Sequence, residues 1–235
     1  MNARRSSALF EMYSQFISDK LDNEWKEKEF GCLLIEPVLQ GAGGMNLIDP
    51  LFQLALIQDC KRRKIPVVYD EVFSGIWRLG RLSGGAVLGE FPDIAVFSKL
   101  LTGGSVPLAA TLATAQVFDV FKGHGKAEAL LHGHSYTAHP IGCSAGCYSL
   151  DMYFQSTNYN SISNTMDEFW NESIAKKISQ LECIVRVITI GTVFAIELKS
   201  STSDYSSRSI LTTQLVSMLR SNGIYTRPLG NVVYL

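Results

Sequence analysis

Three short apolar runs, at residues 32–38, 66–72 and 93–99, recur along the first part of the chain. Each is rich in leucine, isoleucine or valine, which is typical of buried parallel strands. A helical stretch at 51–64 lies between the first two runs, and Asp49 stands before it in a capping position, followed by a proline. This order predicts a βαβ unit whose two strands run parallel.

The α/β pattern continues to about residue 155. We expect an amphipathic helix at 10–21, a glycine-rich loop at 40–46, a further strand at 108–114 and a helix at 141–154. Together with the βαβ unit, these elements predict an α/β domain with a mostly parallel sheet.

A polar, linker-like segment at 155–165 separates this part from a second set of elements. We expect a helix at 166–182, followed by two strand segments at 185–199 that are joined by a turn at Gly191. A second helix at 209–223 ends at Gly223, and a turn and strand close the chain at 227–235. This mixture predicts a small α+β domain. We therefore place part of a large domain at 1–155 and part of a small domain at 156–235.

The composition is that of an ordinary globular protein of 235 residues with a formal net charge of −1. This charge gives no reason to expect nucleic acid or an anionic membrane as a partner, and no apolar run approaches the length of a membrane span. The five cysteines are scattered and never form a C-x-x-C pair, which favours reduced thiols in a reducing compartment. The basic start resembles part of a mitochondrial transit peptide, but the amphipathic pattern after it favours an ordinary helix.

The candidate chemistry lies at two strand ends, where Asp70 and Lys99 close neighbouring apolar runs. The carboxyl ends of parallel strands form the edge at which α/β proteins bind ligands. A carboxylate and an amine together suit a pyridoxal cofactor, because the amine forms a Schiff base and the carboxylate partners the ring nitrogen. Each residue also has an ordinary interpretation, as a capping or turn aspartate and a solvated turn lysine. The apolar flanks of Lys99 predict partial desolvation, which makes an amine more nucleophilic.

Other patterns narrow the choice of ligand. The QGAGG loop lacks the spacing of a dinucleotide site, because Asn46 stands where the third glycine belongs, and no P-loop sequence is present. All four histidines fall between His124 and His139, and three of them lie in HGHSYTAH, which has no carboxylate and no common zinc spacing, so no metal is expected. Ser135 and Thr137 offer hydroxyls for a phosphate. Arg227 is either a surface arginine or a clamp on a substrate carboxylate.

Four motifs together resemble those of the class III aminotransferases in order and spacing: EPVLQGAGGM, DEVFSGIWRLG, SKLLTGG and HGHSYTAHP. In the last motif, His139 stands where the family commonly has asparagine. The resemblance covers almost the entire chain and implies a fold-type I PLP-dependent transferase, with part of the large α/β domain followed by part of the small one. The family's N-terminal portion, which carries a Gly-Ser phosphate cup, has no counterpart here, so we expect a fragment of a longer enzyme.

The resemblance implies pyridoxal 5′-phosphate (PLP) as cofactor and assigns five residues to it. Lys99 would be the Schiff-base lysine and the base and acid of the proton shift, Asp70 the partner of the pyridinium nitrogen, and Val72 a residue packed on the ring. His134 and Ser135 lie in the loop that in the family reaches the phosphate of the neighbouring subunit, where threonine is usual. A homodimer is therefore expected.

Within the class, RPLGNVVYL, LTGGSVPLAATLAT and LLHGHSYTAHPIGC are similar to the plant and fungal diaminopelargonate aminotransferases of biotin synthesis. That family moves an amino group from S-adenosylmethionine to 8-amino-7-oxononanoate, in a mitochondrial protein that also carries a dethiobiotin synthetase. Arg227 would then bind the substrate carboxylate, and Arg78 would lie on the substrate side. Two alternatives stay open: an aminotransferase for another ω-amine, such as ornithine or GABA, or an inactive fragment that serves as a dimerisation module.

Overall fold

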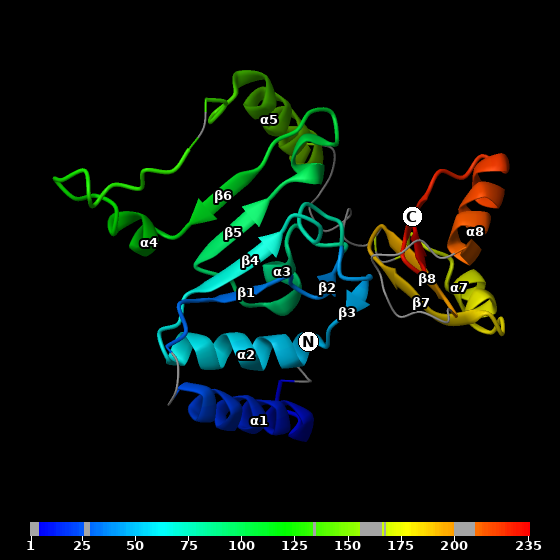
Figure 1. The fold of residues 1–235 in the computed structure, drawn as a ribbon, viewed down its shortest axis with the longest axis horizontal. Coiled ribbons are helices and arrows are strands. Elements are labelled where there is room, and N and C mark those ends of the chain that lie inside the picture. Colours follow the sequence, from blue (N-terminus) through cyan, green and yellow to red (C-terminus); the bar gives the residue numbers. More distant parts are fainter. Residues whose placement is uncertain (1–4, 26–28, 134, 156–165, 167, 200–209) are drawn as a thin grey trace. The chain divides into compact units, whose positions relative to one another are not determined.

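The computed structural model describes residues 5–25, 29–133, 135–155, 166, 168–199 and 210–235. The chain divides into two compact units (Figure 1). The first consists of Met1–Val38, Ile48–Ile76 and Ser83–Thr157, and the second consists of Leu39–Leu47, Trp77–Leu82 and Asn158–Leu235. The chain therefore passes repeatedly from one unit to the other.

The first unit contains a four-stranded sheet in the order β1-β4-β5-β6 (Figure 1). Its strands are β1 (Leu33–Ile35), β4 (Val67–Glu71), β5 (Ile94–Phe97) and β6 (Ala110–Ala113). The first three run parallel, whereas β6 pairs antiparallel with β5. The predicted parallel pair on either side of a helix is confirmed, and the sheet is mostly parallel. The antiparallel return of β6 requires no crossover helix.

The helix between the parallel strands is α2 (Pro50–Arg62), and Asp49 caps it as predicted. The Asp49 Oδ1 accepts a hydrogen bond of 2.9 Å from the Leu51 N–H. α1 (Ala8–Trp25) lies beside α2 (Figure 1), and Asp22 of α1 pairs with Arg63 at 2.6 Å. The other helices of this unit are α3 (Gly84–Leu88), the 3₁₀ helix η2 (Lys99–Thr102), α4 (Ala115–Asp119) and α5 (Pro140–Gln155).

The core of the first unit includes apolar side chains of α2 and β4. Leu51, Leu54 and Ile57 of α2 are fully buried, as are Val67 and Tyr69 of β4. Burial alternates along β4, because successive side chains of a strand point to opposite faces of the sheet. Two acidic neighbours at the end of β4 therefore leave the strand on opposite faces.

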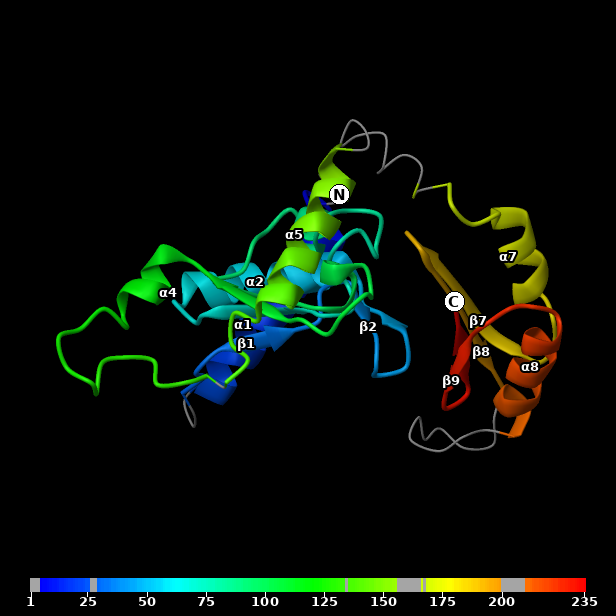
Figure 2. The same cartoon turned by 90° about the horizontal axis from the view of Figure 1, so that it is seen from above.

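The second unit contains an antiparallel sheet in the order β7-β8-β10-β9 (Figure 2). Its strands are β7 (Ile184–Ile190), β8 (Val193–Leu198), β9 (Arg227–Leu229) and β10 (Val232–Tyr234), and its helices include α7 (Glu172–Ser179) and α8 (Ile210–Ser221). The turn at Gly191 is confirmed, with φ of +53°. The final segment is a hairpin rather than a turn and one strand. The predicted helix at 166–182 is shorter, because Asn171 caps α7 by accepting from the Ser173 and Ile174 N–H groups.

The glycine-rich loop belongs to the second unit and closes a short hairpin of β2 (Leu39–Gln40) and β3 (Asn46–Leu47). Arg186 of β7 holds this hairpin: its Nη2 donates to the Gly44 carbonyl at 2.9 Å and to the Asn46 Oδ1 at 2.8 Å. Glu197 of β8 accepts from the Arg186 Nε. The Arg186–Glu197 pair of the second unit's sheet thus fixes the glycine-rich loop, which lies about 140 positions before Arg186 in the chain.

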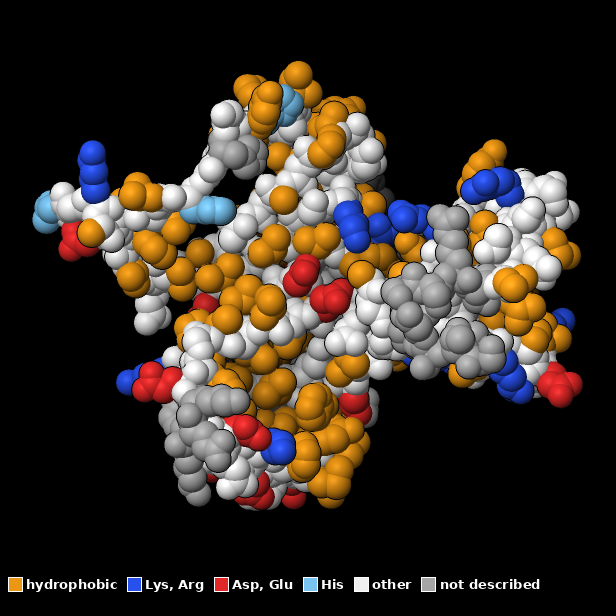
Figure 3. All heavy atoms as spheres, in the orientation of Figure 1, with side chains coloured by type: hydrophobic (Ala, Val, Ile, Leu, Met, Phe, Trp, Pro, Cys, Tyr) orange, Lys and Arg blue, Asp and Glu red, His pale blue; other side chains and the backbone are white. Residues whose placement is uncertain are grey.

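Exposed apolar side chains gather over α4 and α5 of the first unit (Figure 3). On α5 they include Ile141, Tyr148, Met152 and Phe154. Apolar surface of this extent is typical of an interaction surface. No helix among the described residues is long and apolar enough to cross a membrane.

Candidate active site

Asp70 is placed by β4 at the carboxyl end of the parallel sheet. It is half-buried, and its Cα partner on β5 is Val96. Its Oδ1 accepts a hydrogen bond of 3.0 Å from the Val72 N–H, which turns the chain as it leaves the strand. The carboxylate is thus fixed at one oxygen by its own strand end.

Lys99 follows β5 and begins η2, with a left-handed φ of +49°. Such a conformation is uncommon for residues other than glycine, and it occurs often at functional sites. Ser98 supports it, since its hydroxyl donates to the Leu108 carbonyl at 2.7 Å. The predicted partial desolvation of Lys99 is wrong, because the side chain is exposed while its neighbour Leu101 is buried.

The side chain that lies against the Lys99 amine is Phe73, whose ring centroid is 5.1 Å from the Nζ. This is a cation–π contact, and it comes from the turn that follows β4. Phe73, Ser98 and the buried Glu71 were not among the predicted site residues. The nearest signal for Glu71 was its place beside Asp70, since an acid within an apolar run needs partners.

Glu71 is deeply buried, and polar donors surround its carboxylate. The residue is 1% exposed, and burial raises the pKa of its carboxyl group. Hydrogen bonds from the Gly84 and Gly85 amides and from Ser74 oppose this rise. A carboxylate with three donors is a satisfied buried group, and it needs no ion pair.

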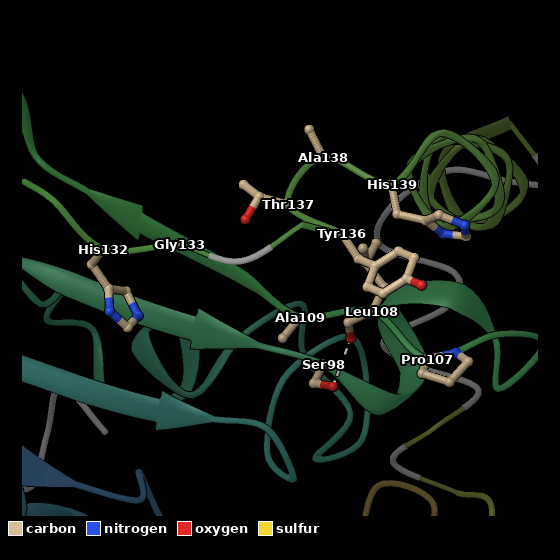
Figure 4. Close-up of a pocket in the computed structure, with 10 residues that line it drawn as sticks. All are labelled: Ser98, Pro107, Leu108, Ala109, His132, Gly133, Tyr136, Thr137, Ala138 and His139. Atoms are coloured by element: carbon tan, nitrogen blue, oxygen red, sulfur yellow. Dashed lines mark hydrogen bonds between the residues drawn. The ribbon is translucent and has the colours of Figure 1, made fainter.

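A cavity of about 820 Å³ lies beside the end of β5 (Figure 4). Its lining comes from Ser98, from the segment before β6 and from the loop that precedes α5: Pro107, Leu108, Ala109, His132, Gly133, Tyr136, Thr137, Ala138 and His139. Thr137 therefore lines the same cavity as Ser98, whereas Ser135 is exposed and is not a lining residue. His134 lies outside the described residues.

His139 ends this loop as the cap of α5. Its Nδ1 accepts a hydrogen bond of 3.2 Å from the Gly142 N–H, and Pro140 is the first residue of the helix. Only a ring with an unprotonated Nδ1 can accept this bond. An asparagine side chain can accept the same bond through its Oδ1.

We expect His139→Asn to preserve stability within about 0.5 kcal/mol, whereas His139→Ala should lower it by about 1 kcal/mol because the cap is lost. Urea unfolding followed by circular dichroism measures both changes. Equal losses for the two variants would show that the Nδ1 bond does not stabilise α5.

Arg78 and Arg227 both belong to the second unit. The Arg78 carbonyl accepts from the Thr192 N–H at 3.0 Å, in the turn between β7 and β8. Arg227 is exposed at the start of β9, and its Cα partner is Tyr234. The structure thus assigns both predicted substrate arginines to one unit, and it assigns Asp70 and Lys99 to the other. Among the described residues, no group of three or more His, Cys, Asp or Glu side chains could hold a metal ion.

Comparison with known proteins identifies similar sequences. The family model for aminotransferase class-III matches residues 5–235. A bifunctional dethiobiotin synthetase/7,8-diamino-pelargonic acid aminotransferase, mitochondrial, of Arabidopsis thaliana is 48% identical over 99% of this chain and 29% of that protein. An adenosylmethionine-8-amino-7-oxononanoate aminotransferase of Geobacter sulfurreducens is 34% identical over 87% of this chain and 46% of that protein.

Solved structures share the fold. The adenosylmethionine-8-amino-7-oxononanoate aminotransferase of Methanocaldococcus jannaschii superposes with a TM-score of 0.82 at 27% identity, over 94% of this chain and 52% of that one. A PLP-bound amine transaminase from an uncultivated Pseudomonas species gives a TM-score of 0.80 at 25% identity, over 97% and 52%. The chain therefore spans about half of these structures and under a third of the Arabidopsis protein.

Proposed function

Since the chain belongs to the class III aminotransferases, we propose that it is the lysine-bearing part of an enzyme that converts 8-amino-7-oxononanoate to 7,8-diaminononanoate. The proposed amino donor is S-adenosylmethionine, and the cofactor is PLP. The names of the plant and bacterial relatives support this substrate and donor. One observation carries the proposal: Asp70 and a strained Lys99 end two neighbouring parallel strands.

The residues at these strand ends fit PLP. The exposed Lys99 amine can bond to the aldehyde carbon of the cofactor. Asp70 can receive the pyridinium N–H at its Oδ2, for which the described part of the chain shows no hydrogen bond. Val72 offers an apolar side chain to one face of the ring. When bound, PLP supplies an electron sink that stabilises negative charge on the substrate carbon beside the transferred nitrogen.

Lys99 is proposed to act twice in the reaction. Its amine would hold the cofactor in the resting enzyme. Once freed by the substrate, the same amine would act as the base and acid of the proton shift. The Phe73 ring, 5.1 Å away, limits where the released amine can go. Asp70 would bind the pyridinium N–H through its carboxylate.

We propose that Arg78 and Arg227 bind the carboxylate of 8-amino-7-oxononanoate, because a guanidinium matches a carboxylate through two parallel hydrogen bonds. Their place in one unit supports a shared role. Ser135 is proposed to bind a cofactor phosphate across a dimer interface, and its exposure supports this role. The predicted part of His134 in the same contact stays a prediction.

The oligomeric state, the cellular location and the domain composition of the enzyme are also proposals. A homodimer is supported by the exposed apolar side chains of α5. A mitochondrial location and a dethiobiotin synthetase in the same polypeptide are supported by the names of plant relatives. We retain 1–155 as part of a large domain and 156–235 as part of a small one, with 39–47 and 77–82 grouping with the latter in space.

A trapping experiment tests the cofactor site. The purified chain is incubated with PLP, reduced with borohydride, digested and examined by mass spectrometry. We expect the phosphopyridoxyl label on the peptide that contains Lys99. A label confined to other lysines would refute the proposed site.

A donor experiment tests the substrate assignment. The complete enzyme should aminate 8-amino-7-oxononanoate with S-adenosylmethionine and not with ornithine or GABA. Turnover with ornithine and none with S-adenosylmethionine would reassign the enzyme to another ω-amine, while Lys99 would keep its role.

A further inference from the structure

One buried carboxylate contacts both ends of the segment that connects β4 to α3. The Glu71 Oε2 accepts from the Gly84 N–H at 2.7 Å and from the Ser74 hydroxyl at 3.2 Å. The Oε1 accepts from the Gly85 N–H at 3.3 Å, and the backbone carbonyl accepts from the Gly75 N–H at 3.0 Å. Glu71 therefore forms hydrogen bonds both where the chain leaves β4 and where it enters α3.

The turn at 72–75 is also fitted closely against the sheet. A Cβ atom added to Gly75 would lie 2.6 Å from the Phe97 ring of β5 and 2.8 Å from the Glu71 carbonyl. Because these contacts leave no room for a side chain at position 75, the backbone of the turn packs directly against the end of β5. A Cβ atom on Gly84 would lie 2.3 Å from Pro37, which fixes the other end in the same way.

The residues carried by this turn are those that contact the proposed catalytic pair. The Val72 N–H donates to the Asp70 carboxylate, and the Phe73 ring lies against the Lys99 amine. Both side chains of the pair are therefore contacted by the turn at 72–75, which directly follows Glu71. Neither contact comes from Glu71 itself.

We propose that Glu71 is a positioning residue: its hydrogen bonds fix the 72–75 turn, so that the Val72 amide meets Asp70 and the Phe73 ring meets the Lys99 amine. This inference rests on the function proposed above, which gives Asp70 and Lys99 their roles. Glu71 acts on them only through the turn. The raised pKa of its carboxyl group reflects the same burial that makes its hydrogen bonds hard to replace.

The variant that tests this role is Glu71→Gln, which keeps the size of the side chain. Whichever way the amide is turned, its NH₂ group faces a backbone N–H that the carboxylate had accepted. The turn should lose its fixed position while the core of β4 stays packed. Glu90→Gln is the matched control, because Glu90 belongs to the same unit and pairs with Lys61 outside this turn.

The position of the Phe73 ring can be read directly by NMR of the full chain labelled with carbon-13 at the lysine Cε. An aromatic ring shifts protons that lie over its face upfield, so the Lys99 ε-CH₂ signal should be upfield in the parent chain. Phe73→Leu should remove the shift and assign the signal. We expect Glu71→Gln to move the signal most of the way to the Phe73→Leu position, and Glu90→Gln to leave it unchanged.

Amide hydrogen exchange separates a positioning role from general support. The Gly84 and Gly85 amides should exchange roughly tenfold faster in Glu71→Gln, as expected when a buried hydrogen bond is lost. Faster exchange with an unchanged Lys99 signal would overturn the proposal. Failure of Lys99 to trap PLP would refute the proposed function instead, and it would leave the NMR result unaffected.

Discussion

Lys99→Ala is expected to abolish the covalent trapping of PLP and to slow transamination by the complete enzyme by at least roughly 10²–10⁴-fold. The variant loses the amine that is proposed both to bond the cofactor and to move a proton. Alanine has no amine, so saturating PLP cannot restore either step. Peptide mass spectrometry after borohydride reduction measures the first effect, and steady-state kinetics measure the second.

The control for this change is Lys126→Ala, since Lys126 is an exposed lysine of the same unit that lies away from the strand ends. Its trapping and its rates should match the parent. A small primary amine added to Lys99→Ala should restore part of the rate, because the proposed role of Lys99 is to carry a proton. A Lys99→Ala enzyme with the parent rate would remove Lys99 from the mechanism.

Gly191→Ala is expected to destabilise the chain by roughly 2–5 kcal/mol, the sum of a left-handed backbone and an overpacked contact. Gly191 has φ of +53°, and a Cβ atom there would lie 2.3 Å from the Gly80 amide nitrogen and 2.4 Å from the Arg78 carbonyl oxygen. These neighbours are backbone atoms and cannot rotate away. Urea unfolding followed by tryptophan fluorescence measures the loss.

The Gly223→Ala variant separates the cost of the left-handed backbone from the cost of the overpacked contact. Gly223 also has a positive φ, of +81°, but nothing lies within 4 Å of the position that a Cβ atom would take. This variant should lose only about 1–2 kcal/mol. If both variants lose the same amount, the close approach of the Gly191 turn to the Arg78 backbone contributes nothing to stability.

Local sequence patterns predicted much of the first unit, because residues within each strand or helix determine where that element forms. The apolar runs that end at Asp70 and Lys99 are neighbouring parallel strands, and Asp49 caps the helix between β1 and β4. The predicted family and its α/β fold are confirmed by the match over residues 5–235 and by the solved structures. The roles assigned to individual site residues stay predictions.

Other features depend on contacts between distant segments, which a local pattern does not contain. Apolar neighbours suggested that Lys99 is desolvated, but its side chain is exposed. The partners of Glu71, Gly84 and Gly85, lie 13 and 14 positions away, so no local pattern indicates them. The segment at 77–82 directly follows residues of the first unit, yet it groups with a unit that is mostly formed by residues after 157.

The interleaving of the two units has a consequence for synthesis on the ribosome. Residues 39–47 and 77–82 emerge early, and they carry the buried apolar side chains of Leu39, Met45, Trp77 and Leu79. The residues that hold them include Arg186 of β7 and Thr192 of the turn after it, which are translated more than a hundred codons later. A nascent chain therefore exposes these apolar segments until the residues around 186 and 192 have left the exit tunnel. Slow codons before residue 180 would lengthen that exposure and increase the demand for chaperones.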